Sequence, residues 1–292
     1  YAAAEELVTA LPVTDHPAPN VLVVLSRLAQ QRGQLDVGRD LALDAHHADP
    51  NSAAAALNLQ SALMNAGDID GSLRVAAMVE DRRDWQSASS IARATRLLLE
   101  TSQRGPLTDA MSALEIVVNE FESLGDTHYL GIAYLSLGYL HYARAEATES
   151  LRCADESIAH LSATSAGNEL VSARLLRGIA LAHAGRLDEA RTEVALAAEK
   201  ATPSQGLEVA LESAAIEVLY GDPRQGESIL LPHDGLIDPD RDVGEQAAVV
   251  FALALLGQGR VAQAGGIIGR LRYGQSRSTV AMDAMRLYAR AV

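Results

Sequence analysis

The sequence predicts an all-α fold, a solenoid of antiparallel helix pairs, and two observations carry this prediction. The first is composition. Of the 292 residues, 48% are hydrophobic but only 4% are aromatic, and alanine and leucine, both good helix formers, make up the difference. Such a core suits closely packed thin helices better than a β-sandwich, which favours β-branched and aromatic residues. The second observation is a short phrase that recurs along the chain.

In the recurring phrase a helix ends near a small residue, a turn follows, and another small residue stands five positions later. Its copies are Gly33…Gly38, Gly67…Ser72, Gly105…Ala110, Ala145…Ser150, Gly185…Ala190, Gly221…Gly226 and Gly259…Ala264. They begin 34, 38, 40, 40, 36 and 38 residues apart. A single helix pair cannot bury its apolar face, so neighbouring pairs must stack. We therefore expect about seven repeats.

Apolar periodicity and helix start and stop signals give the expected elements in order. The helix pairs are expected at 20–32/35–47, 52–66/69–81, 87–103/107–123, 127–143/147–162, 168–184/187–200, 206–220/223–231 and 243–257/261–272, with a last helix at 278–291. Residues 1–292 are expected to form one repeat domain. Its weakest linker is 231–242, with two prolines, a glycine and four acids, and a domain break is possible there.

The clearest copy of the phrase runs from Arg177 to Ala190 and reads RGIALAHAGRLDEA. It resembles the tetratricopeptide repeat (TPR) pattern, in which a small residue in helix A precedes a glycine at the turn and an alanine opens helix B. Leu137-Gly138 matches the family's Leu-Gly pair, and Pro50 lies near its terminal proline. The resemblance implies a right-handed superhelical solenoid. The family's tryptophan is absent, and most steps exceed 34 residues.

Glycine and small residues have a physical reason at these places. Gly185 stands where a helix C-terminus favours a left-handed residue. Small side chains at Gly178 and Ala190 would let the two helices of one repeat approach closely. Asp188 and Glu189 then begin the next helix near its positive end.

Charge and motifs argue against several function classes. The net charge is −14, from 38 acidic and 24 basic residues, and Lys200 is the only lysine. A nucleic-acid-binding surface needs clustered basic residues, so we expect no direct contact with nucleic acid. No stretch predicts a membrane span. Neither a catalytic motif nor a metal-ligand spacing occurs, so we expect a protein without enzymatic activity, metal or cofactor.

The single cysteine and the adjacent histidines His46 and His47 are better explained by packing or by solvent exposure than by a reactive site. Cys153 is the only cysteine, which excludes an intrachain disulfide and favours a packed small hydrophobe. His46 and His47 are expected at a solvated helix end. His141 and His183 lie near the turn in helix A of two successive repeats and could line one face together.

Both ends of the chain read as interrupted repeats. Ala4, Val8 and Leu11 form one apolar face, as expected for the second helix of an earlier pair. The last expected helix, 278–291, has no partner after it. We therefore expect a cytoplasmic fragment of a larger protein that could self-associate through the ends of the solenoid.

In the TPR family, helix A lines the concave face, and the resemblance implies which residues lie there. The candidate binding residues are Arg27, Asn58, Arg96, Tyr139, Tyr142, Ile179, His183 and Val250. Asn58 and Arg96 coincide with two positions of the carboxylate clamp of chaperone-binding members, but Val23 replaces its first lysine. We expect a peptide or amphipathic helix with an acidic end near Arg27 or Arg96. The alternative is that the apolar positions pack against the next helix.

Two function classes remain open. The repeat length and the interrupted ends resemble the helical repeat region of MalT-like (LuxR-type) bacterial transcriptional regulators. This resemblance implies a sensor region that binds a protein, a peptide or a small inducer. The alternative is a free-standing TPR interaction scaffold or a peptide-pheromone receptor.

Overall fold

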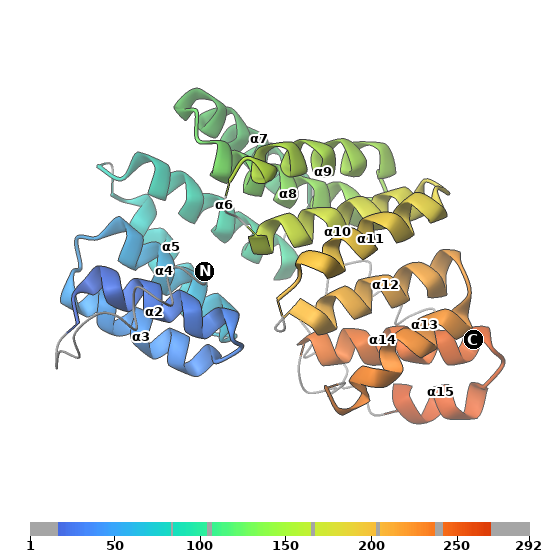
Figure 1. Ribbon diagram of the computed structural model, residues 1–292. Coiled ribbons are helices and arrows are strands. Elements are labelled where there is room, and N and C mark those ends of the chain that lie inside the picture. The colour runs from blue at the N-terminus through green and yellow to red at the C-terminus, as the bar shows by residue number, and fades with distance from the viewer. Residues whose placement is uncertain are drawn as a thin grey trace. The chain divides into compact units, whose positions relative to one another are not determined.

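The computed structural model describes residues 17–82, 84–103, 107–164, 167–202, 205–236 and 242–269. This part of the chain holds fourteen α-helices, one 3-10 helix and no strand. The fold is therefore an all-α helical repeat, as the sequence predicts (Figure 1). None of the described helices is both long and apolar enough to cross a membrane.

The chain divides into two compact units, and each is described by itself. Unit 1 comprises Tyr1–Glu100 and Asn119–Gly125, and unit 2 comprises Thr101–Val118 and Asp126–Val292. The helices of unit 1 are α2 (Pro19–Gln31), α3 (Leu35–Ala48), α4 (Ala53–Asn65), α5 (Ile69–Glu80) and most of α6 (Gln86–Gln103). Helix α7 (Leu107–Leu124) gives its first part to unit 2 and its last turns to unit 1.

Unit 2 continues with four helix pairs. They are α8 (Thr127–Ala143) with α9 (Ala147–Ser162), α10 (Gly167–His183) with α11 (Leu187–Lys200), α12 (Gly206–Tyr220) with α13 (Pro223–Leu230), and α14 (Asp242–Gly257) with α15 (Val261–Ile268). The 3-10 helix η2 (Leu231–Leu236) follows α13. Each first helix contacts the next first helix, from α8 through α10 and α12 to α14. The expected weak linker 231–242 thus lies inside unit 2, since α12 and α13 both contact α14.

The predicted helix bounds lie within one residue of the observed ones, apart from the end of α15. That predicted end, at 272, lies outside the described residues, as do the expected helix at 278–291 and the N-terminal face of Ala4, Val8 and Leu11. Several helices begin where the sequence supplies a capping oxygen. Asp68 accepts from the backbone N–H of Gly71 at 2.9 Å, and Asp126 accepts from that of Tyr129 at 3.2 Å.

The recurring phrase has the predicted structural role. Five of its first members have a positive φ: Gly33, Gly67, Ala145, Gly185 and Gly259. Gly221 departs from the pattern with φ −123°, and Gly105 lies outside the described residues. The seven second members are all buried in the following helix. The phrase therefore encodes a left-handed turn followed by a close contact between the two helices of a pair.

Those close contacts join helices through small residues and backbone oxygens. The hydroxyl of Ser150 donates to the carbonyl oxygen of Gly138 at 3.0 Å, and that of Ser26 donates to Gly38 at 2.7 Å. Cys153 is completely buried beside Gly138, and burial raises the pKa of its thiol to about 11. Cys153 is therefore a packed small residue, as expected, and not an activated nucleophile.

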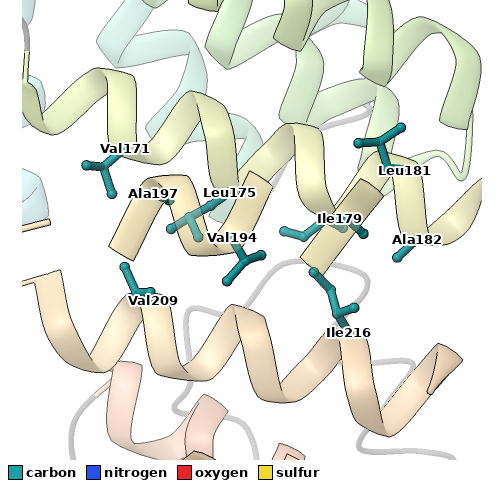
Figure 2. Close-up of a cluster of buried hydrophobic side chains, with 10 residues drawn as sticks. Val171, Leu175, Ile179, Leu181, Ala182, Val194, Ala197, Val209 and Ile216 are labelled. Atoms are coloured by element: carbon teal, nitrogen blue, oxygen red, sulfur yellow. The ribbon is translucent and has the colours of Figure 1, made fainter. Parts of the chain in front are cut away.

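The apolar core of unit 2 lies between successive pairs. Figure 2 shows one cluster, in which Leu175 and Ile179 of α10 and Val194 of α11 face Val209 and Ile216 of α12. These side chains are buried or nearly so. They hold α10, α11 and α12 in fixed positions, and the partly exposed side chains of α8, α10 and α12 lie over this core.

Candidate functional site

The candidate residues of unit 1 serve mainly internal contacts. Asn58 is 3% exposed, and its amide donates to the hydroxyl of Ser26 at 2.9 Å. Arg96 forms a bidentate ion pair with Glu80, with N–O distances of 2.7 and 3.1 Å. Arg27 is exposed on α2. A ligand carboxylate at Arg96 would thus have to compete with Glu80, and Asn58 is already committed to holding two repeats together.

Two apolar candidates are core residues. Ile179 is 4% exposed and packs in the cluster of Figure 2, and Val250 is fully buried between α12, α13 and α14. No ligand can reach these side chains without opening the helix packing. The alternative stated for the apolar positions, packing against the next helix, therefore holds for these two, and we remove them from the candidate site.

The other three candidates lie together in unit 2. The ring of Tyr142 on α8 meets the imidazole of His183 on α10 edge-on, with centroids 6.5 Å apart. His183 in turn stacks on Tyr220 of α12 at 6.2 Å. Tyr139 lies one turn before Tyr142, and its pKa is raised well above the ordinary value by burial and by the charges of Glu212 and Glu208. One surface thus crosses α8, α10 and α12, the first helices of three successive pairs.

His141 does not share this surface. It is 8% exposed, and its Nδ1 lies 2.7 Å from Oε2 of Glu146 at the following turn. This contact, together with the guanidinium of Arg144, lowers the pKa of the Glu146 carboxyl. The expectation that His141 and His183 line one face together is therefore wrong, because only His183 turns towards Tyr142 and Tyr220.

Two carboxylates of α12 that were not among the expected site residues add to this surface. Glu208 and Glu212 stand one turn apart on α12, each partly exposed. Burial raises the pKa of Glu208, and burial together with the charge of Glu208 raises the pKa of Glu212 to about 7. We name the six residues Tyr139, Tyr142, His183, Glu208, Glu212 and Tyr220 the acidic aromatic cluster.

A signal for this pair was present in the sequence. Helix 206–220 reads GLEVALESAAIEVLY, with three glutamates and no lysine or arginine. Two glutamates at an i, i+4 spacing repel each other on a helix surface. This helix is otherwise mostly apolar, and it carries no basic residue that could compensate the pair. The two carboxylates are therefore expected to lower the stability of the folded chain.

Unit 2 has a second hollow, on the other side of α12. It lies between α11, α12 and α13 and is lined by Val194, Ala198, Val209, Ala210 and Ile229, with Arg191 and His233 among its polar residues. Half of its lining residues are alanine or valine, and its arginine already pairs with Glu217 at 2.7 Å. The acidic aromatic cluster offers more unpaired polar groups and is the stronger candidate.

No protein-family model matches the sequence, and no curated protein matches it either. Solved structures do. A Rap protein complexed with competence and sporulation factor shares 10% identity and superposes with a TM-score of 0.65, over 92% of this chain and 77% of that one. The Rap conjugation gene regulator of plasmid pLS20, in complex with the Phr* peptide, shares 13% identity with a TM-score of 0.60, over 85% and 76% of the two chains.

A third similar structure is a thermophilic TPR protein of Thermus thermophilus. It shares 17% identity with a TM-score of 0.54, over 69% of this chain and all of that one. At these identities the likeness concerns the fold. Together with the helix pairs and turns described above, it shows that this chain has the all-α helical repeat fold of TPR proteins.

Proposed function

We propose that this chain is a non-catalytic repeat scaffold that binds a protein or peptide on the acidic aromatic cluster of unit 2. The observation that carries the proposal is the aromatic series Tyr142, His183 and Tyr220, which runs across the first helices of three successive pairs with centroid distances of 6.5 and 6.2 Å. Each of the six side chains keeps part of its surface exposed, so a ligand can touch all three helices at once.

Residue chemistry supports this assignment. Tyrosine supplies a large contact area with few rotatable bonds, and it is among the residues that most often contribute binding energy at interfaces. The underlying core of Figure 2 fixes the backbone positions of α10 and α12, so little ordering is needed on binding. Two of the similar solved structures, the Rap proteins, are complexes with competence and sporulation factor or with the Phr* peptide, which favours a peptide among the ligand classes.

A finer proposal concerns biological context. We propose that the repeats are the sensor region of a larger bacterial transcriptional regulator, with a free-standing scaffold or peptide-pheromone receptor as the second candidate. The likeness to the Rap folds supports the second candidate, and the MalT-like repeat lengths support the first. The coding sequence on both sides separates them, because an adjoining ATPase or helix-turn-helix domain belongs only to the first.

The binding proposal can be tested with a displayed library of random peptides selected on the chain. We expect the selected peptides to lose about tenfold or more in affinity when Tyr142→Ala and Tyr220→Ala are combined. Tyr134→Ala is the matched control, since Tyr134 lies on α8 but stacks on His160 of α9 at 5.9 Å. Equal affinity of the parent and the double variant would remove the cluster as the binding surface.

A further inference from the structure

Glu208 and Glu212 differ from the other acids that the repeats hold between helices. Glu193 is 7% exposed and pairs with Arg174 at 2.9 Å and with Arg177. Glu217 is 4% exposed and pairs with Arg191 at 2.7 and 2.9 Å. In each case an arginine of a neighbouring helix neutralises the carboxylate.

Glu227 follows the same rule, with Arg260 at 2.6 Å and Gln258 at 2.7 Å. Those partners lower the pKa values of Glu217 and Glu227, whereas the pKa values of Glu208 and Glu212 are raised. Among the described residues, no arginine, lysine or histidine forms an ion pair with Glu208 or Glu212, and helix α12 itself contains no basic residue. Two adjacent carboxylates that lose water without gaining a cation destabilise the folded chain.

The surroundings of the pair are suited to a cation. Tyr139 and Tyr142 present aromatic rings near the pair, and the faces of such rings attract ammonium and guanidinium groups. After burial, the negative charge of Glu212 contributes to the raised pKa of both Tyr139 and Tyr142, so the carboxylate is near enough to act on both hydroxyls. Nδ1 of His183, in the middle of the aromatic series, is buried and has no hydrogen-bond partner in the described part of the chain. Acidic side chains and aromatic rings therefore share one surface, and an unsatisfied polar atom of His183 is buried beneath the aromatic series.

We propose that the occupant of the acidic aromatic cluster is the positively charged side chain of an arginine or lysine in a bound peptide, held by Glu208 and Glu212 and flanked by the rings of Tyr139 and Tyr142. This inference rests on the proposed peptide-binding function and names the chemistry that the ligand must carry. It reverses the ligand charge expected from the sequence, which placed an acidic end near Arg27 or Arg96. Arg96, one of those two arginines, is neutralised by Glu80, whereas Glu208 and Glu212 have no basic partner among the described residues.

The test compares two variants that have the same net charge. Random hexapeptides are displayed and selected on the parent chain, on Glu208→Gln/Glu212→Gln and on Asp44→Asn/Glu199→Gln. Asp44 and Glu199 are exposed acids of α3 and α11, outside the cluster, so the control removes two charges without touching it. Selection in about 0.15 M salt screens the long-range attraction of basic peptides to the acidic chain.

We expect peptides selected on the parent and on the control to share an arginine or lysine at one position. One such peptide, resynthesised, should bind the cluster variant at least tenfold more weakly, and the same loss should follow when citrulline replaces its arginine. Selected peptides without a basic residue, or with equal affinity for both variants, would overturn this inference while leaving peptide binding intact. A parent chain that enriches no peptide would overturn the proposed function and this inference with it.

Discussion

Gly178 on α10 faces the backbone of Ala190 on α11: a Cβ atom built on Gly178 would lie 3.3 Å from the carbonyl oxygen of Ala190 and 3.1 Å from Cγ2 of Val194. Ala190 itself is completely buried. The two helices of this repeat are therefore held together at a spacing that only small side chains permit, and this spacing leads to the first prediction.

Ala190→Leu should destabilise the chain by about 1–3 kcal/mol, because the added atoms must force α10 and α11 apart or adopt a strained rotamer. Ala195→Leu is the matched control, since Ala195 lies on the same helix but is exposed. Urea denaturation measures both. If Ala190→Leu and the control had the same urea midpoint, Ala190 would not lie in a close contact between α10 and α11.

Ala145→Gly should stabilise the chain by about 0.5–1 kcal/mol. Ala145 has φ 60°, a left-handed conformation that costs a residue with a Cβ atom about 1–2 kcal/mol, partly offset because glycine gains more entropy on unfolding. The equivalent turn residue Gly185 has φ 78°, so Gly185→Ala should act in the opposite direction. Thermal unfolding of the two variants and of the parent measures both effects. A lower Tm for Ala145→Gly than for the parent would contradict the argument.

The repeat phrase was predictable because it is local. A left-handed turn needs glycine, and a close helix contact needs a small residue five positions later; both demands appear directly in the sequence from Gly33 to Ala264. The helix bounds follow from the same local signals. Ala145 could be placed in the pattern by spacing alone, although alanine is not the residue that its turn prefers.

The site was only partly predictable, because it depends on which side chains from different repeats meet. Counting helix positions grouped Tyr142 with His183, and their rings are neighbours in the structure, 6.5 Å apart. The same counting could not show that Ile179 is enclosed by α11 and α12, or that Arg96 pairs with Glu80 of the preceding helix. Glu208 and Glu212 were missed because their unpaired state becomes visible only once the partners of the other acids are known.

Ion pairs in this fold should contribute differently to stability according to how deeply the carboxylate is buried. Glu193 is 7% exposed and bound by two arginines. Glu193→Gln should therefore cost about 1–3 kcal/mol, since the arginines lose a charged partner at a site with little water. Glu189 pairs with Arg186 on the surface, where water and salt screen the charges. Glu189→Gln should not shift the urea midpoint, and equal effects of the two substitutions would argue that burial does not decide the strength of these pairs.

Glu212→Gln should stabilise the unliganded chain at pH 8. The pKa of Glu212 is raised from 4.5 to about 7 on folding, by burial first and by the charge of Glu208 second. Between these two values the folded state holds more protons than the unfolded state, so this group makes stability fall as pH rises from about 4.5 to 7. Above that range the penalty is complete and amounts to about 1–3 kcal/mol for a partly exposed carboxyl. Glutamine carries no charge, so the variant does not have this penalty.

The advantage of Glu212→Gln over the parent should therefore shrink as the pH falls from 8 to 5.5, because the parent's carboxyl becomes protonated in the folded state. Urea denaturation at these two pH values measures it, with Glu199→Gln as the control, since Glu199 is exposed on α11. A peptide that carries an arginine should reverse the order, because it stabilises the parent and not the variant. If Glu212→Gln lowered stability at pH 8 in the absence of peptide, Glu212 would have a stabilising partner in the fold, and the argument for a cationic ligand would lose its physical basis.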